Sequence, residues 1–135
     1  MKKMLFQFFV REKISKGGIE NLVSEVFNTK DVGNIEGNES HKIFYGYQPY
    51  EGEFKTSIEL YVEEKYAASK NILSDKTLGI LVAKSLNTSV LVSDDHLNPY
   101  TWLLIENGQV YEVEQLDQGE NNMTVRKKDS HPIAL

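Results

Sequence analysis

The sequence predicts an α+β fold in which a mostly antiparallel sheet carries two helices on one face. Three observations predict it. Residues 54–63 alternate apolar and polar side chains, as a half-buried strand does. Apolar residues recur at helical spacing in two segments, 19–27 and 74–87. The dipeptide Asn107-Gly108 lies between two apolar runs, which is the strongest short-range signal for a β-hairpin.

The first half of the chain contains three predicted strands and one helix. The run Met4–Val10 is short and rich in aromatic residues, which favours a buried strand. Residues 28–40 are polar and turn-rich, and predict a loop. Two strands follow at 41–47 and 54–63, joined by a turn at 49–52. The apolar stripe of the helix is formed by Ile19, Leu22, Val23, Val26 and Phe27.

The second half begins with a helix whose two ends are marked by capping residues. Ser74 can cap its N-terminus, and Asn87 can adopt the left-handed conformation at its C-terminus. Residues 90–92 predict a short buried strand, and 100–115 predict the hairpin. Residues 123–127 predict a last short strand.

The first six predicted elements, over residues 4–93, follow the order strand, helix, strand, strand, helix, strand (βαββαβ). This order resembles the split βαβ pattern of ferredoxin-like domains, and related α+β sandwiches share it. At 135 residues, we expect a single domain over 1–127 and a flexible C-terminal tail over 128–135. Such a fold hosts many unrelated functions and therefore does not indicate one.

Composition excludes several classes of function. The chain has no cysteine, which excludes disulfides, thiolate zinc sites and cysteine nucleophiles. The N-terminal apolar run is too short for a signal peptide or a membrane helix and is followed at once by Arg11-Glu12-Lys13. We therefore expect a cytoplasmic protein without membrane contact. No phosphate-binding loop, dinucleotide fingerprint or hydrolase motif is present, so we expect no cofactor and assign no catalytic residue.

The charge of the chain is unevenly distributed. From Ser85 to Val125 there is no lysine or arginine, whereas the formal net charge of the whole chain is −5. Segregated charge produces a directional field that steers a basic partner and repels nucleic acid, which we do not expect as a ligand. The acidic residues of this segment are Asp94, Asp95, Glu106, Glu112, Glu114, Asp117 and Glu120.

A two-residue turn at Asn107-Gly108 fixes the register of the hairpin, because paired side chains share a face. One predicted face is a core set: Tyr100, Trp102, Leu104, Tyr111 and Val113. The other face is half apolar and half acidic: Thr101, Leu103, Ile105, Val110, Glu112 and Glu114. This second face either packs inside the molecule or forms a partner-binding surface with an apolar patch rimmed by carboxylates.

The charge and the hairpin together predict a small acidic module that binds a basic protein through the acidic face of the 100–115 hairpin. Bacterial immunity proteins, which neutralise basic toxins, use the same physics, so an immunity- or antitoxin-like role is our expectation. Carboxylates would steer the encounter, and apolar side chains would supply affinity. The predicted contact residues are Leu103, Ile105, Glu112, Glu114, Asp94 and Asp95.

Two other hypotheses belong to different classes. An enzyme or a small-ligand or metal-binding protein would use Asp94-Asp95-His96, together with the turn Tyr47–Tyr50. Three consecutive residues cannot easily face one ion, however, and no spaced ligand set completes the site, so we expect no metal. The third hypothesis is a homodimer formed through the second hairpin face or through an edge strand.

Overall fold

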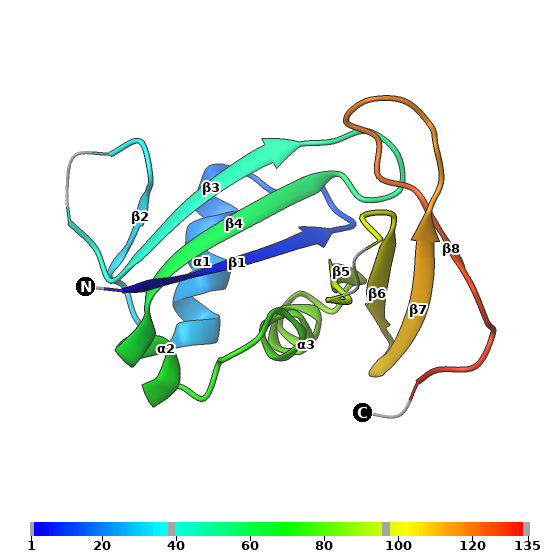
Figure 1. Ribbon diagram of the computed structural model, residues 1–135. Coiled ribbons are helices and arrows are strands. Elements are labelled where there is room, and N and C mark those ends of the chain that lie inside the picture. Colours follow the sequence, from blue (N-terminus) through cyan, green and yellow to red (C-terminus); the bar gives the residue numbers. More distant parts are fainter. Residues whose placement is uncertain (1, 38–39, 96–97, 134–135) are drawn as a thin grey trace.

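The computed structural model describes residues 2–37, 40–95 and 98–133 (Figure 1). Within these ranges the chain forms one sheet and a few helices. The elements in chain order are β1 (Lys3–Val10), α1 (Lys16–Phe27), β2 (Val32–Asn34), β3 (Ile43–Pro49), β4 (Thr56–Glu63), α2 (Glu64–Ser69), α3 (Asp75–Leu86), β5 (Val90–Ser93), β6 (Thr101–Glu106), β7 (Gln109–Gln115) and β8 (Val125–Lys127).

The strands form an 8-stranded sheet in the order β2-β3-β4-β1-β5-β6-β7-β8. Neighbours are antiparallel except for β2 and β3, which are parallel. The predicted α+β class with a mostly antiparallel sheet is therefore confirmed. The predicted order of elements is not confirmed, because β2 and α2 are additional and interrupt it. The assignment to a ferredoxin-like fold is not confirmed either.

Both long helices begin at a serine whose side chain caps the helix and end at an asparagine whose backbone N–H caps it. The side chain of Ser15 accepts a hydrogen bond from Gly18 N at the start of α1, and that of Ser74 accepts one from Thr77 N at the start of α3. Asn28 and Asn87 end the two helices in the left-handed conformation. The caps predicted for the second helix are thus confirmed.

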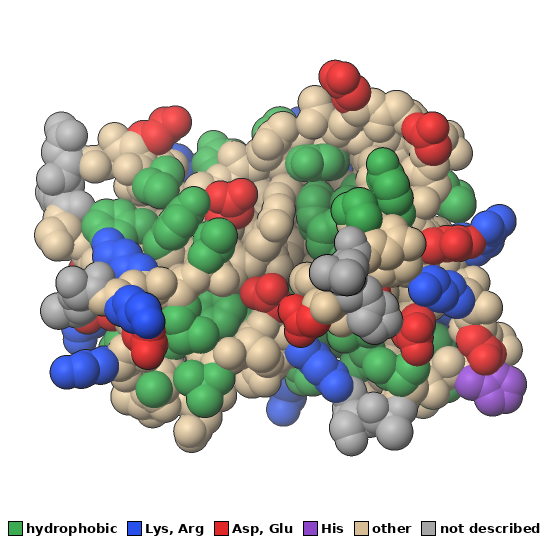
Figure 2. Space-filling model, in the orientation of Figure 1, with side chains coloured by type: hydrophobic (Ala, Val, Ile, Leu, Met, Phe, Trp, Pro, Cys, Tyr) green, Lys and Arg blue, Asp and Glu red, His purple; other side chains and the backbone are tan. Residues whose placement is uncertain are grey.

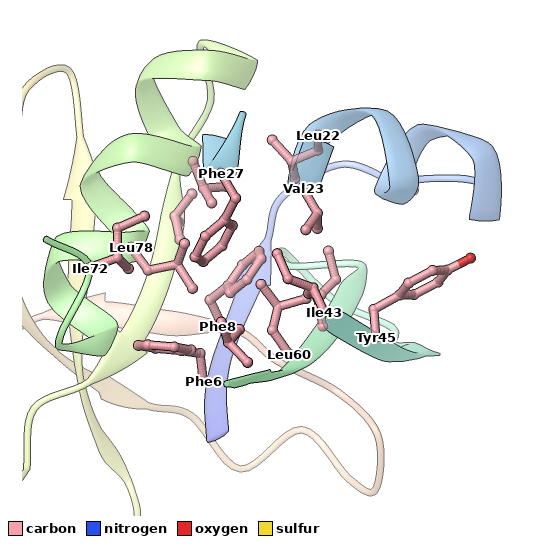
Figure 3. Close-up of a cluster of buried hydrophobic side chains, with 14 of the residues drawn as sticks. Phe6, Phe8, Leu22, Val23, Phe27, Ile43, Tyr45, Leu60, Ile72 and Leu78 are labelled. Atoms are coloured by element: carbon pink, nitrogen blue, oxygen red, sulfur yellow. The ribbon is translucent and has the colours of Figure 1, made fainter. Parts of the chain in front are cut away.

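The main core lies between the sheet and the two long helices, which cover the same face of the sheet (Figure 1). Figure 3 shows side chains of β1, β3 and β4 directed toward those of α1 and α3, whereas the hydroxyl of Tyr45 points away from the cluster. That hydroxyl donates a hydrogen bond to Glu20 of α1. The largest fully buried members of this core include Phe6, Phe8, Phe27, Ile58 and Leu78.

A second, smaller core lies on the other face of the sheet, because the sheet curls over itself. The turn after β3 reaches the segment between β7 and β8, as Figure 1 shows at the upper right. Phe54 N donates to Met123 O at 2.9 Å, and Met123 N donates to Glu51 O at 2.9 Å. The buried residues enclosed by this closure are Phe9, Phe54, Leu91, Leu104, Val113 and Met123.

Of the segment 128–135, predicted as a flexible tail, the structure describes residues 128–133, which run back along the hairpin. Ile133 N donates to Val110 O at 2.7 Å, and the Ile133 side chain packs against the main core. None of the helices in the described ranges combines the length and the apolar character that a membrane crossing requires.

Candidate functional site

The hairpin formed by β6 and β7 has the register predicted from its turn. The two strands are joined at Asn107-Gly108, where both residues have positive φ, as a type I′ turn requires. The observed pairs are Thr101 with Glu114, Trp102 with Val113, Leu103 with Glu112, Leu104 with Tyr111, Ile105 with Val110, and Glu106 with Gln109. Every predicted pair is confirmed.

One face of the hairpin packs in the second core, with a single exception. Leu104 and Val113 are buried there, and Trp102 and Tyr111 pack against them. Tyr100 is 62% exposed, so its predicted place in this core set is wrong. The strand begins at Thr101, and Tyr100 belongs to the preceding turn, where strand alternation no longer decides its side.

The apolar half of the other face is turned toward α3. Ile105 is 2% exposed and Val110 is 1% exposed, both within the main core. Leu103 is half-buried and packs against the same core. Of the two interpretations of this face, the structure therefore has the one in which its apolar residues pack inside the molecule.

The acidic half of this face lies next to the chain's own basic residues. Strand β8 pairs with β7 and places Arg126 opposite Glu114, where the guanidinium donates two hydrogen bonds to the carboxylate. This hydrogen bonding and the charge of Arg126 lower the pKa of Glu114. Over β7 and β8, on the right of Figure 2, acidic and basic side chains lie beside one another. The negative charge of the hairpin is thus partly neutralised by basic side chains that lie next to it in the fold.

Glu106, at the turn end of β6, is held by several donors. It accepts hydrogen bonds from Arg11 and Lys127, each at 3.3 Å, and from the Ser89 hydroxyl at 3.0 Å. Partial burial raises its pKa, but these hydrogen bonds and the two positive charges outweigh burial, so the pKa of Glu106 is lowered. Glu112 is half-exposed and makes no ion pair with any residue that the structure describes.

The loop after β5 begins with Asp94 and Asp95. Asp95 has a φ of 61°, and its N–H donates to the Ser93 hydroxyl at 3.1 Å, which is ordinary turn geometry. Burial raises the pKa of Asp75 at the start of α3, and the charge of Asp95 adds to this, although a hydrogen bond from the Gln7 N–H opposes it. Asp94 and Asp95 therefore lie near the N-terminal end of α3.

The metal and ligand hypothesis for this loop stays a prediction, because His96 lies outside the described residues. Within the described ranges, no three His, Asp or Glu side chains gather as a metal-binding group. The turn Tyr47–Tyr50 does not join the loop, since two strands of the sheet, β4 and β1, separate β3 from β5. Tyr47 lines a cavity at the edge of β3, whereas Tyr50 packs edge-on against Phe9 in the second core.

Two acidic loops meet at the end of the hairpin opposite its turn. Gln115 N donates to Tyr100 O at 2.7 Å, which places the start of the loop after β7 beside the end of the loop after β5. We define the open end of the hairpin by its exposed residues Asp95, Tyr100, Asp117 and Glu120. Acidic side chains project at the top of Figure 2, where the loop after β7 meets the turn after β3.

The acidic residues of the open end were expected from the sequence to lie in the two loops that flank the hairpin, but the exposed aromatic residue between them was not expected. The signal that could have found Tyr100 is Asn98-Pro99, a turn sequence directly before it. The Asn98 side chain accepts a hydrogen bond from Tyr100 N at 2.9 Å, so Tyr100 is held in the turn.

The homodimer hypothesis stays a prediction. A search of family models, of curated proteins and of solved structures finds no match to this chain.

Proposed function

We propose that this chain is a small acidic protein-binding module, of the immunity or antitoxin kind, and that its partner is a basic protein. The proposed contact surface is the open end of the β6–β7 hairpin. The observation that carries the proposal is Tyr100, an aromatic side chain that is 62% exposed between two acidic loops. Tyrosine is enriched among the residues that dominate binding energy at protein interfaces.

The carboxylates of the open end keep their negative charge, whereas Glu106 and Glu114 in the hairpin strands are neutralised by ion pairs. Within the described part of the chain, Asp95, Asp117 and Glu120 form no ion pair, but Glu106 and Glu114 are paired with Arg11, Lys127 and Arg126. Unpaired surface carboxylates contribute mainly to the rate of association with a positively charged partner. The proposed field is therefore centred on the two loops.

The structure changes which residues the proposal relies on. Leu103 and Ile105, expected from the sequence to be apolar contacts, face α3 and stabilise the fold instead. Glu114 is engaged by Arg126. Asp94 and Asp95 keep their proposed part in the field, whereas Glu112, paired with Leu103 within β7, is not part of the proposed surface. Tyr100 replaces Leu103 and Ile105 as the proposed apolar contact with the partner.

The test compares two triple variants that change the net charge equally. Wild type and both variants are used as bait in extracts of cells that express the protein, and captured proteins are identified by mass spectrometry. A basic protein that is captured by wild type and by the control variant, but not by the open-end variant, supports the proposal. The open-end variant is Asp95→Asn, Asp117→Asn and Glu120→Gln. The control variant is Glu25→Gln, Glu36→Gln and Glu64→Gln, all at exposed positions.

Binding kinetics with the captured protein then separate the contribution of the surface carboxylates from that of the Tyr100 side chain. We expect the association rate to fall between low and physiological ionic strength, because salt screens exposed charges. Tyr100→Ala should raise Kd by more than about tenfold, mainly through faster dissociation. Ile35→Ala, which alters an exposed apolar side chain directly after β2, at the edge of the sheet far from the hairpin, should have no effect. Equal capture by both triple variants, or a salt-independent association rate, would reject the proposal.

We also propose that β1, α1, β3, β4, α3 and β5 form a ferredoxin-like unit. The sheet order β3-β4-β1-β5, with antiparallel neighbours throughout, supports this proposal. On this view β2 and α2 are insertions, and the β6–β7 hairpin extends the sheet at the β5 edge.

A further inference from the structure

A cavity of about 570 Å³ lies at the turn end of the hairpin, between β6–β7 and the C-terminal half of α3. This volume is within the range of small-molecule sites, roughly 300–1,000 Å³. Its apolar lining comes from Ile80 and Ala83 of α3 and from Ile105 and Val110 of the hairpin. Because Ile105 and Val110 belong to the main core, this wall is rigidly supported.

The two carboxylates of the lining already accept hydrogen bonds from the protein. Glu106 accepts from Ser89, Arg11 and Lys127, as described above. Glu12 accepts a hydrogen bond from the Thr88 hydroxyl. Both carboxylates that line the cavity are therefore held by donors of the protein itself.

The donors of the lining are not all engaged. Arg11 lines the cavity, and its Nε is buried without a hydrogen-bond partner among the described residues. The Nη2 of Arg11 donates to Glu53 and Glu106, each at 3.3 Å, so the remaining hydrogen-bonding capacity of Arg11 lies on its other nitrogens, and the unpaired buried Nε is costly. Lys84, in the last turn of α3, also lines the cavity and forms no ion pair with a described residue.

We propose that this cavity binds a small amphipathic carboxylate. The apolar body of the ligand packs on the Ile80, Ala83, Ile105 and Val110 wall, and its carboxylate accepts hydrogen bonds from Arg11 and Lys84. A guanidinium and an ammonium are the donors that carboxylates prefer, and such charge-assisted bonds are roughly twice as strong as neutral ones. This site is independent of the proposed protein-binding surface, because the two occupy opposite ends of the hairpin.

Octanoate is the probe for the test, and 1-octanol is its uncharged counterpart. In ¹⁵N-resolved NMR titrations of the full chain, we expect octanoate to shift amide signals around Thr88 and Gly108, which line the cavity. The affinity of 1-octanol should be lower by about tenfold, because it lacks the charge-assisted hydrogen bonds. Equal affinity for the two probes, or amide shifts only elsewhere in the molecule, would overturn the proposal.

Two variants locate the ligand, each with a matched control. Lys84→Gln should weaken octanoate binding by about tenfold and leave 1-octanol binding unchanged. Lys76→Gln, nearer the start of the same helix, should change neither. Ala83→Leu should fill the cavity and abolish binding of both probes, whereas Ala68→Leu on the exposed side of α2 should not. Unaltered octanoate binding in both Lys84→Gln and Ala83→Leu contradicts the proposed site.

Discussion

Gly79 determines how closely α3 approaches the sheet. A Cβ atom at this position would lie 2.6 Å from Val92 Cγ1 and 2.7 Å from Ile105 Cδ1. Both neighbours are buried in the main core, and the branched Val92 side chain has little freedom to move. Only glycine therefore allows the helix its present distance from β5 and β6.

Gly79→Ala and Gly17→Ala should change stability in opposite directions. Alanine favours helix over glycine by up to about 1 kcal/mol, but at Gly79 overpacking costs about 1–3 kcal/mol, so the net effect is destabilising. At Gly17, in the first turn of α1, a Cβ meets no atom within 4 Å, and the variant should gain a few tenths of a kcal/mol or more. Urea denaturation measures both, and stabilisation by Gly79→Ala would contradict the packing argument.

At the scale of elements, the Glu106 carboxylate of β6 links β8 to the residue that follows β1. Glu106 of β6 contacts Lys127 of β8 and Arg11, which directly follows β1. Its lowered pKa means that the folded state prefers the charged carboxylate. The stability from this group is therefore present above its ordinary pKa of 4.5 and is lost as the pH falls through the lower pKa of the folded state.

Glu106→Gln should remove part of the acid sensitivity of the protein. Near pH 7 the variant should be less stable than wild type, because the charged hydrogen bonds to Arg11 and Lys127 are weakened. Below pH 4.5 the two free energies of unfolding should converge, because the wild-type carboxylate takes up a proton. Denaturation curves at several pH values measure this, with Glu25→Gln on α1 as the control. Parallel curves for wild type and Glu106→Gln would show that the network contributes nothing.

Elements with their own local signals could be predicted, and those without could not. Asn107-Gly108 fixes the hairpin register because its turn geometry is local, and Ser74 and Asn87 define α3 through its caps. By contrast, β2 has three residues and no alternation, and it pairs with β3 through Ile43 N and Asp31 O. The six-residue α2 follows β4 directly and has no side-chain cap, so no local sequence pattern predicts it.

The candidate site was predictable in its charges but not in its contacts. The acidic residues are visible in the sequence, whereas their neutralisation depends on β8 returning to β7, a tertiary contact that no local pattern encodes. Ile105 alternates correctly for a strand, but its contact with α3 depends on how the helix lies across the sheet. Tyr100 shows the limit at the residue level, since the strand begins only at the next position, Thr101.

Across the whole molecule, the curled sheet is closed by contacts between the turn after β3 and the segment before β8. Gly52 lies within this closure with a φ of +92°, and a Cβ there would lie 2.5 Å from both Asn122 Oδ1 and Thr124 Oγ1. Those two side chains are hydrogen-bonded to each other, and Thr124 Oγ1 also accepts from Glu53 N. The closure therefore requires both the backbone freedom and the small size of glycine.

Gly52→Ala should open this closure, and Gly119→Ala provides the matched control. Gly119 also has a positive φ, +98°, but a Cβ there meets no atom within 4 Å. Gly119→Ala should cost about 1–2 kcal/mol from backbone strain alone, and Gly52→Ala should cost more. Hydrogen exchange should show faster exchange at Phe54 N and Met123 N in Gly52→Ala only. Equal stability losses with unchanged exchange at these amides would contradict this account.

The closure also has a consequence for the time course of synthesis. The Glu53 N–Thr124 Oγ1 hydrogen bond joins residues 71 positions apart, so the second core requires nearly the whole chain. Contacts of such high sequence separation form slowly, because a long loop must be closed before they are gained. On the ribosome, β1 to β5 can assemble with their helices first. Phe9 and Phe54 then stay exposed to solvent until the last strands pack over them. The nascent chain therefore exposes an aromatic surface that the finished molecule hides.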